Sequence, residues 1–214
     1  MRIKALIKMG NIYLVFFFLL SPVIILQSIG LPMESRGYLM DESYSINNLH
    51  QITHQVPFDR QSMNQCAGYV ASFVLRYYGF DLSGGDVYRE MVYFRYYSYG
   101  IMPGKLVKTL NAHGLKANMY RGRTEHLYYY ISRDIPVIVL IGEGLRWQHY
   151  LVLLGYNRDL SKFYFYDPSR GPLSGVSPYP GNRVMDKEEF TSLWQNRVPF
   201  YNNLYIPVKG RIDA

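Results

Sequence analysis

The stretch CAGYVASFVLRYYG, residues 66–79, predicts the helix around which the rest of the chain is organised. Apolar residues recur in it at three- and four-residue steps, as on one face of an α-helix: Ala67, Val70, Ala71, Val74 and Tyr78. Gly79 follows at the position where a left-handed residue commonly ends a helix. We therefore expect a helix over residues 66–78, with Cys66 at its first position.

Cys66 is the only cysteine of the chain, so no internal disulfide can form. A thiol attacks carbonyl groups as the thiolate, and both the positive end of a helix dipole and a neighbouring imidazolium stabilise that form. Taken alone, a cysteine that opens an apolar helix is more often a small buried apolar residue. Cys66 is therefore a candidate nucleophile only if the chain also supplies a base.

Beyond this helix the pattern predicts more helices first and a sheet second. The further predicted helices lie within residues 85–93, at 103–113 and at 124–132. Short runs rich in β-branched, leucine and aromatic residues then predict successive antiparallel strands at residues 135–141, 150–156 and 163–166. A loop over residues 168–183 leads to a predicted helix at 186–195 and a last strand at 204–208. This order is typical of an α+β fold.

A histidine and an aspartate mark the two ends of one predicted hairpin. His149 opens the strand HYLVLLGY and Asp167 closes the strand KFYFYD. If the hairpin is centred on Arg158, the two residues face each other at roughly 5 Å, and the carboxylate can accept the second proton of the imidazole and orient it. Each residue also has an ordinary interpretation, His149 as a strand-end histidine bonded to backbone and Asp167 as a turn residue before Pro168.

Several segments, in this order and spacing, carry a family resemblance. They are VPFDRQSMNQCAG at 56–68, LRYYG at 75–79, WQHYLVLLGY at 147–156, YDP at 166–168 with Gly171, and Phe190 with Trp194. Together they resemble the peptidases that process bacteriocin leader peptides, a branch of the papain-like cysteine peptidases. The resemblance covers most of residues 56–194. It implies a papain-like fold, in which an N-terminal catalytic helix packs on an antiparallel β-sheet.

The same resemblance implies a role for Gln61, which matches a glutamine that donates to the developing oxyanion. Its amide and the backbone N–H of Cys66 would stabilise the tetrahedral intermediate. The alternatives are that Gln61 is an ordinary surface amide or that the neighbouring Gln65 takes the role. The family usually has glycine directly after the cysteine, whereas Ala67 stands here before Gly68. We expect this difference to alter crowding at the site without abolishing activity.

The N-terminus has the composition of an export signal. A basic stretch at residues 1–11 is followed by the apolar residues 12–26 and then by small residues before residue 31. Residues 12–31 are also about as long as a membrane-spanning helix, roughly 20 residues. Both a cleaved signal and a retained membrane anchor fit, and either predicts a secreted or membrane-anchored, extracytoplasmic protein. We divide the chain into this segment (1–30), a linker or arm (31–55) and a peptidase domain (56–214).

The charge of the chain gives little support to a nucleic-acid partner. Of the net charge of +7, three units come from Arg2, Lys4 and Lys8, and the remainder forms no cluster of Lys and Arg. A metal or a phosphate-binding loop is also not expected. HQITH at residues 50–54 lacks the glutamate of a zinc peptidase, and GIMPGK at 100–105 is too short for a phosphate loop. No cofactor is predicted, and the expected partner is a peptide or protein substrate.

Two groups of tyrosines could either line a peptide groove or form partly buried helix faces. The residues are Tyr93, Tyr96, Tyr97 and Tyr99 in one group and Tyr128, Tyr129 and Tyr130 in the other. Aromatic side chains of this kind can line a peptide groove, because they supply contact area at low entropic cost. Partly buried helix faces have the same composition.

Our hypothesis from the sequence is hydrolysis of a peptide or isopeptide bond. Cys66 is the predicted nucleophile, His149 the base and Asp167 the residue that orients the base, with Gln61 as oxyanion donor. One alternative is a papain-like amidase or transpeptidase that acts on peptidoglycan stem peptides. The other is a catalytically inactive papain-like module used for binding.

Overall fold

The computed structural model describes residues 32–34, 46–53, 56–92, 100–171 and 179–210 of the chain. The predicted export signal or membrane anchor lies outside these ranges, as does most of the predicted arm. Among the described residues, no helix has both the length and the apolar composition needed to cross a membrane.

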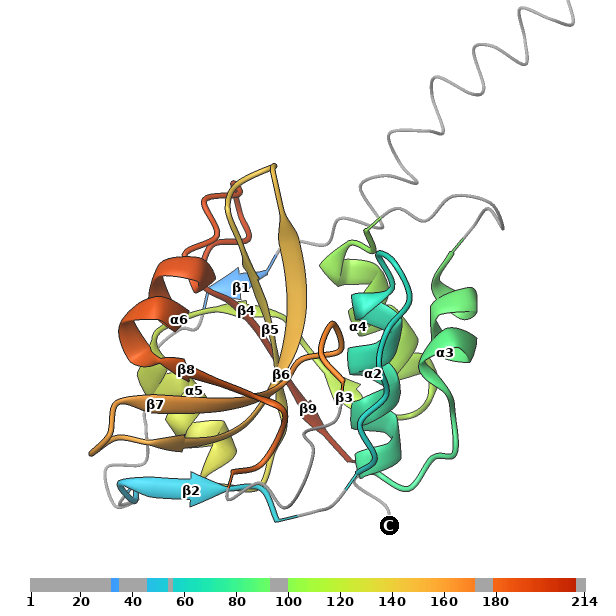
Figure 1. Cartoon of the computed structure of the whole chain (residues 1–214). Helices are drawn as coiled ribbons and strands as arrows, with labels where there is room; N and C mark the ends of the chain where they lie inside the picture. The colour runs from blue at the N-terminus through green and yellow to red at the C-terminus, as the bar shows by residue number, and fades with distance from the viewer. Residues whose placement is uncertain (1–31, 35–45, 54–55, 93–99, 172–178, 211–214) are drawn as a thin grey trace, which may run out of the picture.

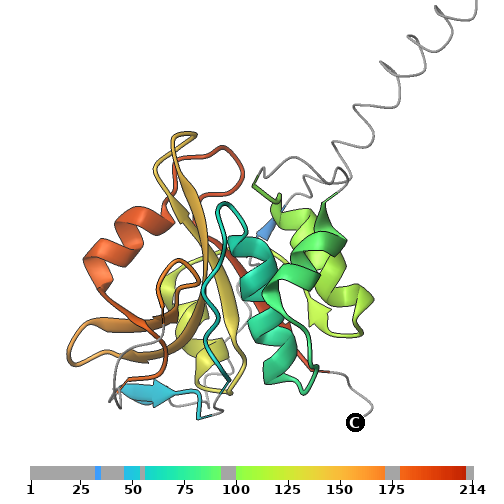
Figure 2. The same ribbon diagram turned by 45° about the vertical axis from the view of Figure 1, so that its right-hand side comes forward.

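Helices lie on both sides of a central sheet (Figure 1). On one side are α2 (Cys66–Tyr77), α3 (Gly84–Met91) and α4 (Pro103–Ala112), and on the other is α6 (Lys187–Trp194). A further helix, α5 (Thr124–Ile131), contacts β5 and β6 of the sheet. The turned view in Figure 2 shows the same separation, with α2, α3 and α4 grouped away from α6.

The sheet has the order β1-β4-β9-β5-β6-β7-β8, with β2 paired to β6 and β3 paired to β9. Every pair is antiparallel except β1 with β4. The strands are β1 (Met33–Glu34), β2 (Leu49–Gln51), β3 (Lys116–Ala117), β4 (Tyr120–Arg121), β5 (Val137–Gly142), β6 (Gln148–Asn157), β7 (Lys162–Tyr166), β8 (Arg183–Asp186) and β9 (Leu204–Lys209). The predicted α+β class with a helix packed on an antiparallel sheet is confirmed.

Helix ends follow the predicted backbone chemistry. Gly79 and Gly114 have φ values of +87° and +83°, which place them in the left-handed region just beyond α2 and α4. Pro103 is the first residue of α4, where its missing N–H would be unpaired in any case. These local rules are why the four helices predicted between residues 66 and 132 are all found.

Five strands were not predicted: β1, β2, β3, β4 and β8. In two of them, β2 and β8, the sequence pattern is weak. Leu49–Gln51, inside the predicted arm, pairs with β6 as β2, and the adjacent Ile52 is buried. β8 follows the predicted loop and pairs with β7, but only Met185 of its four residues is buried. An edge strand with one buried side chain carries little hydrophobic alternation, so it does not stand out in the sequence. Residues 54–55 lie outside the described ranges, and the predicted boundary at 55/56 stays a prediction.

Of the three tyrosines of α5, Tyr128 and Tyr130 are buried and Tyr129 is half-buried. Tyr128 stacks on Phe163 with ring centroids 5.5 Å apart, and Tyr130 packs near Tyr205. Apolar contacts with the sheet cover most of Tyr128 and Tyr130, and Tyr128 also lines a cavity of about 560 Å³. The tyrosines between 93 and 99 lie outside the described residues.

The first histidine of the HQITH segment lies among the described residues. His50 contacts the Asp134 carboxylate, with 3.0 Å between Nε2 and Oδ1. No group of three or more His, Cys, Asp or Glu side chains within the described ranges is arranged to hold a metal ion. His54 lies outside those ranges.

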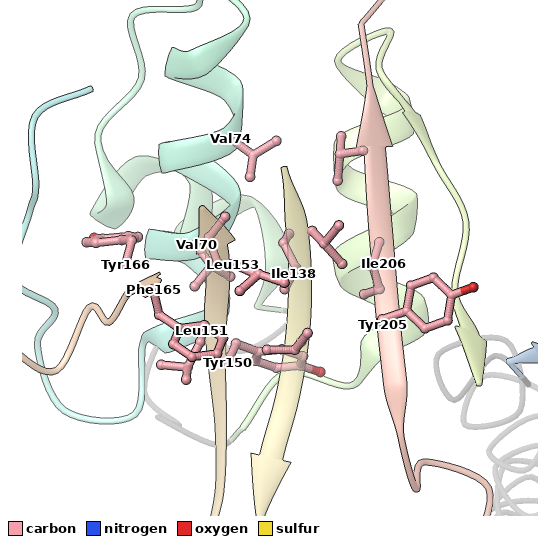
Figure 3. Packing of buried hydrophobic residues seen from close by; sticks show 14 of the residues in the cluster. Val70, Val74, Ile138, Tyr150, Leu151, Leu153, Phe165, Tyr166, Tyr205 and Ile206 are labelled. Atoms are coloured by element: carbon pink, nitrogen blue, oxygen red, sulfur yellow. The ribbon is translucent and has the colours of Figure 1, made fainter. Parts of the chain in front are cut away.

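The core fixes α2 against the strand that follows the predicted base. Figure 3 shows Val70 and Val74 of α2 pointing toward Leu153 of β6 and Ile138 of β5. All four side chains are buried. Burial of such side chains stabilises the fold by about 1.5–3 kcal/mol each, so the position of the helix relative to β6 is firmly set.

Close approach of α2 and α3 generates a prediction at Gly68. A Cβ at this position would meet the Cβ of Tyr88 and lie 2.7 Å from the carbonyl oxygen of Gly84. Those atoms cannot rotate away, so Gly68→Ala should force the helices apart and lower the free energy of unfolding by about 1–3 kcal/mol. Urea or thermal unfolding of the purified variant measures this.

Gly85→Ala is the matched control for that experiment. Its new Cβ would have only the Ser83 Oγ nearby, at 4.0 Å, and alanine is favoured over glycine inside a helix by up to about 1 kcal/mol. The control should be as stable as the natural protein or slightly more so. Equal loss of stability in both variants would contradict a specific α2–α3 constraint.

Candidate active site

Cys66 is the first residue of α2, as predicted, and its side chain is buried. The preceding residue, Gln65, makes no side-chain hydrogen bond to the helix end, and the first turn contains no acidic residue. The positive end of the helix is thus not neutralised by a side chain of the first turn. Cys66 lies at this end of the helix, where the partial positive charge is located.

The segment that leads into Cys66 is anchored to the end of β7. Phe58 stacks on Phe73 of α2 and on Tyr166 of β7, with ring centroids 5.8 and 5.5 Å apart. The Tyr166 hydroxyl donates to the carbonyl oxygen of Asp59 at 2.6 Å, and Arg76 of α2 forms an ion pair with the Asp59 carboxylate at 2.9 Å. These contacts hold the nucleophile segment between the helix and the strand that ends before Asp167.

Gln61 lies beside the aspartate turn. Its backbone N–H donates to the carbonyl oxygen of Pro168 at 2.7 Å, and its side-chain Oε1 is buried with no hydrogen-bond partner among the described residues. A buried unpaired amide oxygen costs about 1–3 kcal/mol and calls for an explanation such as a functional constraint. Gln65 instead lines a cavity of about 600 Å³ between the nucleophile segment and α3.

His149 and Asp167 are in contact, as predicted from the hairpin. The distance from His149 Nε2 to Asp167 Oδ1 is 2.8 Å, and both side chains are buried. An ionised carboxylate can only accept, so Nε2–H is the donor and Nδ1 is left for another partner. Cys66 lies close enough to the imidazole to raise its pKa. The structure therefore brings the three predicted residues near one another.

The hairpin register that predicted this contact was wrong. The turn is centred between Asp159 and Leu160, because Asn157 pairs with Lys162. If the pairing at this turn continued unchanged along β7, Asp167 would lie opposite Val152. Its side chain would then point to the opposite face of the sheet from His149.

A β-bulge in β6 brings Asp167 to the same face of the sheet as His149. The pairing shifts by one residue between Leu153 and Gly155, so that Leu153 lies opposite Phe165. Continued by the same register, Asp167 falls opposite Leu151, two residues from His149 and on its side of the sheet. The extra residue, Leu154, thus brings imidazole and carboxylate together.

Three residues that the sequence did not single out hold Asp167 in place, two at its carboxylate and one at its backbone. The hydroxyl and backbone N–H of Ser169 donate to Oδ1 at 2.6 and 2.9 Å, and Arg183 donates to Oδ2 at 3.0 Å. The buried Asn182 bonds both to the backbone N–H of Asp167 and to its carbonyl oxygen. Ser169 follows the Asp-Pro pair closely enough to be found as a turn residue. Asn182 and Arg183 are remote in sequence and gave no signal.

The hydrogen bonds of this group set the charge of each member. Burial alone would raise the pKa of Asp167, but the hydrogen bonds from His149 and Ser169 outweigh it and hold that pKa well below its usual range. Burial alone would lower the pKa of His149, but the hydrogen bonds to Asp167 and Cys66 raise it to about 9. Near neutral pH the site therefore combines a carboxylate with an imidazolium.

The comparisons with known proteins give the family. The model described as Peptidase_C39 like family matches residues 45–199, which is well over half of the chain. This chain belongs to the peptidase C39-like family. The predicted resemblance to papain-like cysteine peptidases is confirmed. A search of curated proteins gave no match.

Solved structures give the same fold. A double glycine motif protease from an AMS/PCAT transporter, solved in complex with the leader peptide, is 20% identical, with a TM-score of 0.51 over 75% of this chain and 98% of that one. The peptidase domain of Streptococcus ComA, a bifunctional ABC transporter of a quorum-sensing pathway, is 19% identical, with a TM-score of 0.53 over 74% of this chain and 100% of that one. At these identities the likeness establishes the papain-like C39 peptidase fold of this member of the family.

The raised pKa of His149 predicts the alkaline limit of activity. Because the protonated imidazole is lost as the pH rises through about 9, kcat/KM on a cleaved peptide should fall above that pH. Asp167→Asn removes the carboxylate that keeps the proton on His149, so the alkaline limb should move down toward the ordinary histidine value of about 6.5. The pH profiles of kcat/KM, or an NMR titration of His149, measure the shift.

Lys162→Met is a suitable control, because it removes the ion pair between Lys162 and Asp186 at the far end of the same hairpin. Its pH profile should match that of the natural protein. An alkaline limb that stays in place in Asp167→Asn would show that the carboxylate does not set the charge of the imidazole.

Proposed function

We propose that this protein is an exported or surface-anchored cysteine peptidase that hydrolyses peptide bonds through Cys66, His149 and Asp167. The observation that carries the proposal is the 2.8 Å contact between the buried Asp167 carboxylate and His149, beside a thiol at a helix start. Such an arrangement activates a cysteine without a metal or cofactor. Membership of a family of cysteine peptidases supports the reaction class.

In the acylation half of the reaction, the sulfur of Cys66 attacks the carbonyl carbon of the scissile bond. The new C–S bond forms as the carbonyl π pair moves to oxygen. His149, protonated by the thiol proton, then gives this proton to the departing nitrogen as the C–N bond breaks. The products of this half are a free amine and a thioester on Cys66. Asp167 holds the imidazole ring and its positive charge throughout.

In the second half, His149 takes a proton from water as the water oxygen attacks the thioester carbon. Collapse of the second tetrahedral intermediate breaks the C–S bond and releases the acid product, and the site returns to its starting protonation state. The carboxylate of Asp167 stays ionised, since its surrounding donors stabilise the charged form.

Gln61 is proposed as a donor to the oxyanion in both halves, together with the backbone N–H of Cys66. Two observations support this role. The hydrogen bond from Gln61 to Pro168 keeps it beside the aspartate turn, and its side-chain oxygen is buried without a partner among the described residues. Amide donors close to the nucleophile are among the groups that stabilise the oxyanion as its charge develops.

The proposed substrate is a peptide or protein outside the cytoplasm. The related double glycine motif protease was solved with a leader peptide bound, which supports a peptide as substrate here. The basic and apolar N-terminus supports export and, if it is retained, anchoring to a membrane.

Cys66→Ala tests the proposed reaction directly. Loss of the nucleophile should reduce peptide hydrolysis by about 10⁴-fold or more. Mass spectrometry of secreted and membrane fractions should find a set of peptides made by the natural protein and missing from Cys66→Ala. A thiol-directed affinity probe should label Cys66 near neutral pH.

Failure of both measurements would support an inactive binding module. Release of stem-peptide fragments from cell walls, with no cleavage of peptide libraries, would point instead to a peptidoglycan amidase.

Gln61→Ala tests the proposed oxyanion donor. Removal of one such donor typically lowers kcat by about 10²–10³-fold, because the lost interaction is made in the transition state. KM should change little. Gln65→Ala removes the neighbouring amide, which faces the cavity toward α3, and should have a much smaller effect on kcat. The opposite order of effects would assign the role to Gln65.

A further inference from the structure

An exposed apolar rim adjoins His149. Trp147, two residues before the histidine, stacks on its ring, with centroids 6.0 Å apart and an angle of 27° between the planes. The indole is still 42% exposed, and Leu145 in the same β5–β6 connection is 91% exposed. A tryptophan that serves only to fill the core would be covered, so the free surface of this indole needs another explanation.

The loop that follows α6 extends this surface. The backbone N–H of Gly144 donates to the carbonyl oxygen of Asn196 at 2.6 Å, which joins the two connections. Both views show them side by side at the same end of the molecule (Figures 1 and 2). The second loop presents Phe200, which is 61% exposed. We call Leu145, Trp147 and Phe200 the apolar rim.

The chemistry of the reaction decides which half of a substrate meets this rim. The acyl half of the peptide is attached to Cys66 in the thioester. The leaving nitrogen must come within hydrogen-bonding distance of His149 to receive its proton. The residues that follow the scissile bond therefore extend over the side of the site that carries Trp147.

We infer that the apolar rim, with Trp147 as its main contact, selects apolar or aromatic side chains just after the scissile bond. This inference rests on the proposed peptidase function and adds the substrate class on the leaving-group side. An indole offers a broad rigid surface, and an aromatic pair contributes energy beyond its buried area. One face of Trp147 lies on His149, and the rest of the ring is available to the peptide.

The charged residues near the rim do not select for charged substrate side chains. Glu143, Arg146 and Arg197 are all exposed in the same two loops and carry opposite signs. Exposed charges are screened over about 8–10 Å at physiological salt. Contact with apolar area is therefore the stronger source of selection.

The test is cleavage of a peptide series that shares one acyl half and varies only in the first residue after the cut. The acyl half is taken from peptides that the natural protein cleaves in a peptide library. The natural protein should prefer Leu, Phe or Trp over Gly or Asp at the varied position. Trp147→Ala should lower kcat/KM for the Leu, Phe and Trp peptides about tenfold and change it less than about twofold for the Gly and Asp peptides.

Two variants keep this result interpretable. Trp147→Phe retains an aromatic ring on His149 and should keep most of the preference. Leu160→Ala removes another exposed leucine, at the far end of β6, and should behave as the natural protein does. A role of Trp147 only in shielding His149 would instead lower kcat/KM equally for all peptides and move the pH profile. That result would overturn the inference.

The remaining outcomes separate this inference from the proposed function. Cleavage by the natural protein with no preference after the cut overturns the inference alone. No cleavage of any library peptide, together with an unlabelled Cys66, overturns both. A rim that serves to contact lipid would show as loss of binding to anionic phospholipid vesicles in Trp147→Ala and Phe200→Ala with unchanged peptide preference, which again overturns the inference.

Discussion

The buried carboxylate of Asp167 is the interaction on which the site and much of the fold depend. It accepts hydrogen bonds from His149, Ser169 and Arg183, and its own backbone is held on both sides by Asn182. The next residue, Pro168, accepts the N–H of Gln61 in the segment that leads to Cys66. One short turn therefore connects the nucleophile segment, the base strand and the start of β8.

A buried charge of this kind is stabilising only while its donors are in place. Removal of an ion from water costs several kcal/mol, which hydrogen bonds and opposite charges offset if the geometry is good. Here both oxygens of Asp167 have donors, and Arg183 supplies a cation close to the second oxygen. The same donors that make the buried charge tolerable also orient His149, so folding and site assembly depend on one set of contacts.

Much of this arrangement could be predicted from local pattern. The helix at Cys66 follows from apolar periodicity and a terminal glycine, and the strands at His149 and Asp167 follow from short apolar runs with turn residues between them. The contact between His149 and Asp167 was expected, but for a register that the structure does not have. The turn is placed differently, and only the bulge at Leu154 returns Asp167 to the face of His149. The predicted turn was misplaced and the bulge was not foreseen. These two errors cancelled, because side chains alternate between the two faces of a sheet with a period of two residues.

The order of residues along the chain already determines where the helices and main strands form and which side chains are chemically suited to catalysis, because those properties depend on neighbours within about one turn or one strand. Only the tertiary structure decides the rest. Asn182 and Arg183 contact Asp167 from about 15 residues further along the chain. β2, which precedes α2 in the sequence, pairs with β6. Trp147 stacks on His149 and is also exposed to solvent. Each depends on contacts between segments distant in sequence, whose geometry is set by packing of the whole sheet against its helices.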